Sequence, residues 1–151
     1  MATPGSQQVY IQDRNSQLVF EYINTANPQY EVVIEKPTSG KPTQQWLVTD
    51  SGVAGYVYIQ SVYDGNVISV GDDKHDTLTV YPKKEGVNLN QLWILRPPDM
   101  DQNNQNFVLM SAKTGYVMDV KSGNKTPGTP IQLYDRNNKY HQQFRFYQYF
   151  N

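Results

Sequence analysis

The sequence predicts an all-β domain built from three four-stranded repeats. A glutamine, one free residue and a large aromatic recur at near-equal spacing, as Gln44-x-Trp46, Gln91-x-Trp93 and Gln142-x-Phe144. Twelve Tyr residues, polar loops and the lack of a long apolar stretch at helical spacing favour strands over helices. A four-stranded unit this small cannot bury its own apolar face, so the three copies are expected to pack on one another.

The repeat extends beyond these motifs. Segments that begin at Tyr10, Tyr58 and Val108 align without a gap over thirteen positions, and their starts are 48 and 50 residues apart. The closing aromatic follows the opening residue by 36, 35 and 36 positions. The repeats are therefore placed at about 9–48, 57–95 and 107–147, within a single domain of residues 1–151.

Each repeat predicts four short strands separated by turn residues such as the segments YDG and KTG. The strands of the second repeat are expected at about 56–61, 66–70, 77–81 and 91–95, and those of the third at about 106–111, 116–120, 130–134 and 143–147. Because antiparallel strands must dispose of exposed edges, closure of the twelve strands into a barrel is expected.

The three motif aromatics, Trp46, Trp93 and Phe144, are expected to fill equivalent core positions near a pseudo-threefold axis. Loss of a buried aromatic typically costs roughly 3–5 kcal/mol. The amide of each motif glutamine both donates and accepts, so it can satisfy buried polar groups nearby. The recurring motif is therefore interpreted first as structure.

Composition argues against several classes of function. Thirteen basic and fourteen acidic side chains nearly cancel, so neither nucleic acid nor an anionic membrane surface is an expected partner. No apolar stretch approaches membrane-spanning length, so insertion into a membrane is not expected either. The chain has no Cys, and no Ser stands in a nucleophile-elbow motif, so no catalytic residue is predicted. The two histidines, His75 and His141, are 66 residues apart, and neither a metal site nor a cofactor is predicted.

The first ten residues, MATPGSQQVY, have neither the basic start nor the apolar run of a signal peptide. We therefore expect a cytoplasmic protein, or one released without a leader.

Three copies of four strands, each ending in Gln-x-aromatic, resemble the β-trefoil of the ricin-B-like (R-type) lectins. The resemblance covers about Val9 to Phe146 and is most specific in residues 115–144, GYVMDVKSGNKTPGTPIQLYDRNNKYHQQF. The pair His141-Gln142 is similar to the His-Gln pair of mushroom lectins of that family. The resemblance implies a non-enzymatic, carbohydrate-binding lectin for galactose or N-acetylgalactosamine in glycans of glycoproteins or glycolipids.

A shallow sugar site needs a carboxylate to accept from vicinal hydroxyls, amides or imidazole to complete the network, and a ring against the apolar face of the sugar. In the third repeat Asp119 is the carboxylate, and Gln132 and Tyr134 share one face of a strand. The resemblance implies that Tyr134 is the stacking ring and that Gln142 orients Asp119. The candidate carbohydrate-binding residues are Asp119, Gln132, Tyr134, Asn137, Asn138, His141 and Gln142.

The second repeat offers a possible weaker site. Tyr81, Asn90 and Gln91 stand at the matching positions, but Ser69 replaces the carboxylate. Asp72 and its neighbour Asp73 follow three and four residues later.

The first repeat is the poorest candidate. Glu21 takes the acidic position with one more methylene, and the ring position falls on Ile34 or Glu35, neither of which offers a ring.

An alternative of another class stays open, because loops of a trefoil can serve as a protease inhibitor or a targeting module of a toxin. The complete set of polar and aromatic residues in the third repeat favours the lectin, since an inhibitor does not need it. With one strong site per chain, binding to cell surfaces would call for a homodimer.

Overall fold

The computed structural model describes residues 7–24, 30–99 and 105–148. The first repeat contains the strands β1 (Val9–Asp13), β2 (Val19–Asn24), β3 (Tyr30–Glu35) and β4 (Trp46–Asp50). The second contains β5 (Val57–Ser61), β6 (Val67–Ser69), β7 (Thr79–Tyr81) and β8 (Trp93–Arg96), and the third β9 (Val108–Ser111), β10 (Val117–Val120), β11 (Ile131–Tyr134) and β12 (Phe144–Gln148). The all-β prediction is confirmed, with most strands one or two residues shorter than expected.

Six strands close a barrel. Antiparallel pairs join β1 to β4, β4 to β5, β5 to β8 and β8 to β9, and β1 also pairs with β12. A bridge between Phe107 and Phe144 completes the ring between the β9 and β12 sides. Closure leaves these strands without a free edge, as the repeat predicts.

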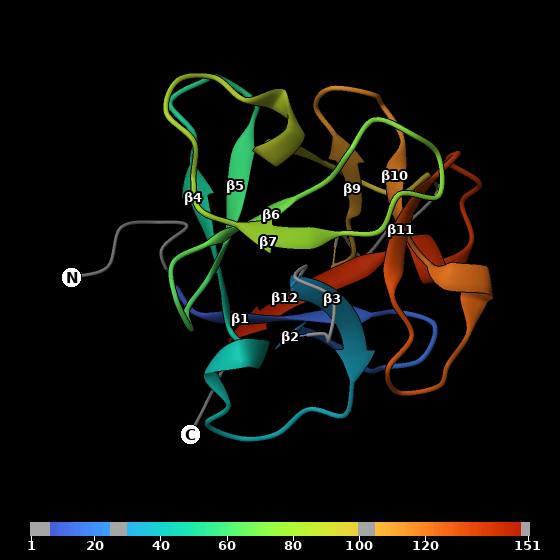
Figure 1. The fold of residues 1–151 in the computed structure, drawn as a ribbon. Coiled ribbons are helices and arrows are strands. Elements are labelled where there is room, and N and C mark those ends of the chain that lie inside the picture. The colour runs from blue at the N-terminus through green and yellow to red at the C-terminus, as the bar shows by residue number, and fades with distance from the viewer. Residues whose placement is uncertain (1–6, 25–29, 100–104, 149–151) are drawn as a thin grey trace.

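The other six strands form three hairpins, β2–β3, β6–β7 and β10–β11, arranged about a common centre (Figure 1). Neighbouring hairpins pair with one another between Glu31 and Thr79, between Val33 and Pro130, and between Thr77 and Gln132. Each hairpin therefore contacts the other two, and residues of one repeat can reach the pocket of the next.

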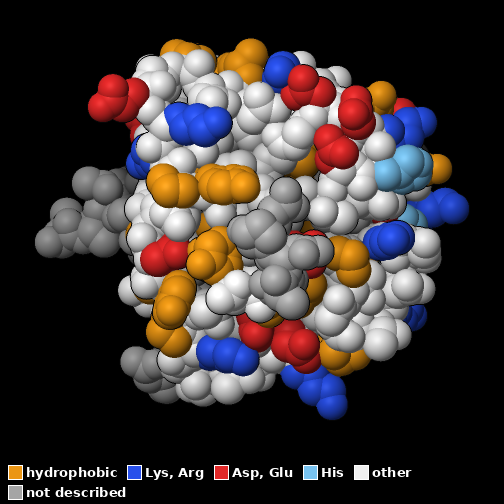
Figure 2. Space-filling view, viewed as in Figure 1, with side chains coloured by type: hydrophobic (Ala, Val, Ile, Leu, Met, Phe, Trp, Pro, Cys, Tyr) orange, Lys and Arg blue, Asp and Glu red, His pale blue; other side chains and the backbone are white. Residues whose placement is uncertain are grey.

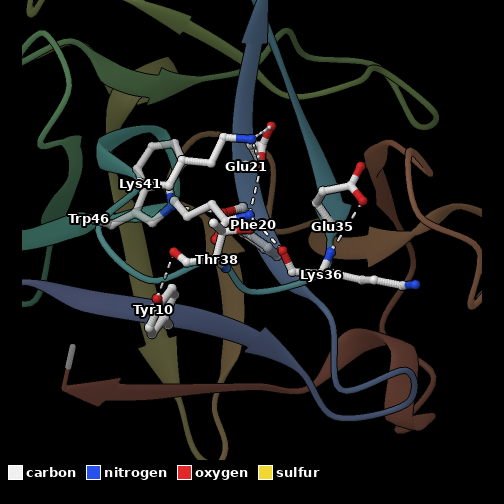
Figure 3. Close-up of polar contacts among 9 residues, drawn as sticks. Tyr10, Phe20, Glu21, Glu35, Lys36, Thr38, Lys41 and Trp46 are labelled. Atoms are coloured by element: carbon white, nitrogen blue, oxygen red, sulfur yellow. Dashed lines mark hydrogen bonds and ion pairs between the residues drawn. The ribbon is translucent and has the colours of Figure 1, made fainter. Parts of the chain in front are cut away.

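The core contains the three motif aromatics, as predicted. Trp46, Trp93 and Phe144 are all 0% exposed. The indole Nε1 of Trp46 donates to the carbonyl of Phe20 at 3.3 Å, and that of Trp93 to the carbonyl of Ile68 at 3.1 Å (the first is drawn in Figure 3).

Each motif glutamine fixes the loop that precedes it. Gln142 accepts from the backbone N–H of Asn137 at 2.8 Å and donates to the carbonyl of Asp135 at 2.8 Å. The same pair of bonds joins Gln91 to residues 84 and 82 and Gln44 to residues 38 and 36. Short 3-10 turns, η1 (Pro42–Gln44), η2 (Leu89–Gln91) and η4 (Tyr140–Gln142), bring the glutamines to these places, and a fourth, η3 (Lys121–Gly123), follows β10. The structural role expected for the glutamines is confirmed.

Candidate functional site

A buried carboxylate lies at the centre of the third hairpin. Asp119 on β10 is paired with Gln132 on β11 and is only 2% exposed. Gln142 Nε2 donates to its Oδ2 at 2.8 Å, and Gln132 Nε2 to its Oδ1 at 3.4 Å. These two hydrogen bonds hold the carboxylate of Asp119 in one orientation. A carboxylate can accept about four hydrogen bonds, so Asp119 can still accept from a ligand.

An imidazole lies beside this carboxylate. His141 Nε2 is 3.3 Å from Asp119 Oδ2. Gly123 lies against the other side of the ring, since a Cβ at this glycine would be 3.2 Å from His141 Nδ1. Gly123 also has φ 65°, a conformation that glycine adopts without strain. The loop after β10 therefore fixes the imidazole next to Asp119.

These groups line a pocket of about 440 Å³. From the third repeat it is lined by Asp119, Gln132, Tyr134, Asn137 and His141, which the sequence singled out, together with the exposed residues Lys121, Ser122 and Lys139. Tyr134 is half-buried and presents part of its ring. The pocket combines an acceptor, amides, an imidazole and a ring.

Two of the predicted residues lie outside this lining. Gln142 is 0% exposed and lies under Asp119, where it can position the carboxylate but cannot reach a ligand. Asn138 is exposed and outside the pocket, and its carbonyl accepts from Gln143 Nε2 at 3.2 Å. The structure therefore gathers five of the seven candidates around one cavity.

Sequence reasoning missed a residue from the second repeat. His75 lines the third pocket, with its ring centroid 5.3 Å from that of Tyr134. Its backbone N–H donates to the carbonyl of Leu133 at 2.8 Å, and the N–H of Leu133 donates to the carbonyl of Asp76 at 2.9 Å. Lys74 forms an ion pair with Asp135 beside it. No spacing within one repeat could have found His75, because its loop crosses between hairpins.

The second repeat also forms a pocket, of about 680 Å³, lined in part by the predicted residues Tyr81, Asn90 and Gln91. At the position of Asp119 it has Ser69, whose hydroxyl donates to the carbonyl of Val67 at 3.2 Å and accepts from Gln91 Nε2 at 3.2 Å. No buried carboxylate is therefore presented to this larger pocket.

The carboxylate of Asp72 lines the second pocket but is already paired. It accepts from Asn90 Nδ2 at 2.8 Å and from Lys113 Nζ at 2.8 Å. The hydrogen bond from Lys113, and then that from Asn90, hold the pKa of Asp72 below its usual value. The amide of Asn90 also donates to the carbonyl of Val70, so both of its N–H groups are used within the protein.

The described residues of the first repeat form no comparable site, and Figure 3 shows the contact of its acidic residue, Glu21, with Lys41. Strand pairing places Glu35 opposite Val19, as Tyr134 is opposite Val117, so Glu35 and not Ile34 takes the ring position. The carboxylate of Glu21 accepts from Gln44 Nε2 at 2.7 Å and lies 3.1 Å from Lys41 Nζ. An internal cation therefore occupies the place that a ligand would need.

Among the described residues, no group of three or more His, Asp or Glu side chains is arranged to hold a metal ion. A search of the same residues for a helix long and apolar enough to cross a membrane found none.

The sequence matches the family model described as ricin-type β-trefoil lectin domain-like, over residues 42–134 and 89–149. Comparison with curated protein sequences found no match.

Solved structures share the fold. A ricin B-like lectin of Macrolepiota procera in complex with lactose has a TM-score of 0.78 and 18% identity, over 98% of this chain and 99% of that one. The C-terminal half of an earthworm R-type lectin in complex with GalNAc has a TM-score of 0.70 and 16% identity, over 94% and 98%. An exo-β-1,3-galactanase of Clostridium thermocellum has a TM-score of 0.82 and 21% identity, over 97% of this chain and only 31% of the enzyme.

Proposed function

Because the chain belongs to the ricin-type β-trefoil lectin family, we propose that it is a non-enzymatic lectin that binds galactose- or N-acetylgalactosamine-type glycans. The observation that carries the proposal is the third pocket, where Asp119, Gln132, Asn137 and His141 surround one cavity beside the ring of Tyr134. Lactose and GalNAc in the two structurally similar lectins support the choice of sugar.

The geometry suits a galactoside. A pyranose with an axial 4-hydroxyl has an unbroken apolar patch on one face, which can lie against Tyr134, while adjacent hydroxyls donate to Asp119. The side-chain amide nitrogen of Asn137 has no hydrogen-bond partner among the described residues, and it can donate to a sugar oxygen. Gln142 and His141 keep the carboxylate aimed at the pocket, so little reorganisation is needed on binding.

The second pocket is proposed as a weaker site. Tyr81 is 43% exposed and can stack on a sugar, but Ser69 supplies a neutral hydroxyl where the third pocket has a carboxylate. Hydrogen bonds to charged groups contribute about 1.5–3 kcal/mol, against roughly 1 kcal/mol for neutral ones. We therefore rank the third pocket first and assign no sugar site to the first repeat.

The test is calorimetric titration with lactose. We expect a dissociation constant on the millimolar scale, which corresponds to a binding free energy of about −4 kcal/mol. Binding should be this weak because an open site competes with water for each hydroxyl of the sugar. Asp119→Ala should weaken the free energy of lactose binding by roughly 1.5–3 kcal/mol or more, so that binding is no longer detected. Tyr134→Ala should also abolish detectable binding, because the stacking of the sugar on the ring is lost. Ser69→Ala, in the second pocket, is the matched control and should leave lactose binding at the third pocket unchanged. Unchanged lactose binding by both Asp119→Ala and Tyr134→Ala would show that the site is misplaced.

A further inference from the structure

The third pocket is bordered by cations that the protein does not neutralise. Lys121 and Lys139 both line it and are exposed, and neither forms an ion pair within the part of the chain that the structure describes. We call these two residues the basic rim. Figure 2 shows the side chains of the two histidines flanked by Lys and Arg. The carboxylate of the pocket, Asp119, is buried beneath and already receives hydrogen bonds from two amides.

The first repeat shows how far a lysine at the position of Lys139 can reach. Lys41 and Lys139 each accept, through the backbone carbonyl, from the N–H of the motif glutamine three residues later, at 3.0 Å in both repeats. Lys41 Nζ lies 3.1 Å from the carboxylate of Glu21, which occupies the acidic position of its hairpin. A lysine at this place can therefore reach the acidic position of its hairpin and pair with a carboxylate there.

The third repeat has the same lysine position but not the same partner. Asp119 is one methylene shorter than Glu21, and its Oδ2 is taken by Gln142 and His141. Lys139 is left facing the pocket without a carboxylate, and Lys121 adds a second cation two residues after Asp119.

The second pocket provides an internal contrast. Asn88 and Gly71 stand where the third repeat has Lys139 and Lys121, so the basic rim is absent. Instead this pocket is lined by three carboxylates, Asp72, Asp73 and Asp76, against two lysines, Lys84 and Lys113. Lys113 is paired with Asp72. The two pockets thus differ in the sign of the charge that they offer a ligand.

We propose that the third pocket prefers galactosides that carry an anionic substituent, a sulfate ester or a carboxylate. Asp119 holds the sugar hydroxyls, and the basic rim contacts the anion. The inference rests on the proposed lectin function and narrows its ligand class. A neutral sugar has no group that needs two ammonium ions, whereas an anion gains from each of them. Two exposed ion pairs together favour a charged ligand by roughly three- to tenfold at low ionic strength, and salt screens this advantage.

The experiment compares lactose with lactose sulfated on the galactose ring, one regioisomer at a time, and with sialyllactose. Wild-type protein should bind at least one charged lactoside roughly three- to tenfold more tightly than lactose at low ionic strength, with a smaller ratio at high ionic strength. If a sulfated lactose binds more tightly than lactose, the preferred anion is a sulfate, and if sialyllactose does, it is a carboxylate. The double variant Lys121→Gln/Lys139→Gln should bring the ratio of the two affinities close to one, because the basic rim then offers no ammonium ion to the anion. Lys84→Gln, in the second pocket, is the matched control and should keep the wild-type ratio.

Binding of lactose with no advantage for any charged lactoside overturns this inference and leaves the proposed function standing. Tighter binding of a charged lactoside than of lactose by the double variant also overturns the inference, because the basic rim is then not the source of the preference. Absence of binding by every lactoside, neutral and charged, counts against both proposals.

Discussion

One side chain in each repeat decides what its pocket offers a ligand. The equivalent residues are Glu21, Ser69 and Asp119, and all three accept a hydrogen bond from the motif glutamine. Only Asp119 combines a charge with a pocket that no lysine of the protein fills. The sequence alone predicted this difference, because carboxylate, hydroxyl and chain length can be compared once the repeats are aligned. It could not predict that Asn138 would lie outside the pocket, because loop conformation sets that position.

A second equivalent set has a buried carboxylate in the first repeat and hydroxyls in the other two. Asp13 is 0% exposed, and its carboxylate accepts from the N–H of Asn15 and from the N–H and hydroxyl of Ser16. The other repeats use Ser61 and Ser111, whose hydroxyls accept from turn amides at 3.1 and 3.3 Å. Burial raises the pKa of Asp13 above 3.8, against the opposing effect of its hydrogen bonds.

Asp13→Ser should therefore change how stability depends on pH. In wild type the cost of the buried charge is present above the raised folded-state pKa and disappears as pH falls below 3.8, because the carboxyl is then protonated in both the folded and the unfolded state. The free energy of unfolding of the variant minus that of wild type should therefore be larger at neutral pH than at a pH well below 3.8. Urea unfolding at the two pH values measures it. A difference that does not vary with pH would contradict the account.

At the scale of elements, the loop between β6 and β7 contributes to two pockets. Its residues Asp72 and Asp73 line the second, while His75 reaches the third and contacts the ring of Tyr134. His75 has φ 78°, a left-handed conformation that costs a non-glycine residue roughly 1–2 kcal/mol. Strands could be predicted from period and turns, but this loop could not, because its conformation depends on pairing with β11.

His75→Gly should separate stability from binding. Glycine relieves the strain at φ 78° but loses the contact with Tyr134 and gains unfolded-state entropy, so the free energy of unfolding should change by less than about 1 kcal/mol. Lactose affinity should fall several-fold, since one wall of the pocket is removed. Thermal unfolding and calorimetric titration of the same sample test both parts. Full lactose affinity in this variant would mean that His75 is not part of the binding surface.

At the scale of the whole molecule, threefold repetition gives pockets that are not equivalent. The repeat fixes the barrel, the three hairpins and the three glutamine contacts alike, whereas the pockets differ in carboxylate, ring and surrounding charge. The family resemblance and the repeat length were sufficient to predict the barrel. The proposed ranking of the pockets also follows from sequence, but their charge does not, because loop conformation decides which charged side chains of a repeat, such as Lys121 and Lys139, line its pocket.

One strong site per chain, as we propose, would limit avidity. A weak galactoside site becomes effective on a cell surface only when two or more sites bind together, which can add roughly two to four powers of ten. We therefore propose that the protein is a homodimer, the commonest symmetric assembly. Light scattering should give twice the mass of one chain. A monomer that binds three lactose molecules with equal affinity would contradict both the ranking of sites and the need for a partner.

The most direct test of the central claim, that the third pocket is the principal galactoside site, is a lactose titration followed by amide NMR signals. We expect the amide signals of Asp119, Gln132 and Asn137 to shift first and together, and those of Ser69 and Asn90 to shift only at higher lactose concentration. Amide shifts that begin in the second pocket, or that spread evenly over the three repeats, would contradict it.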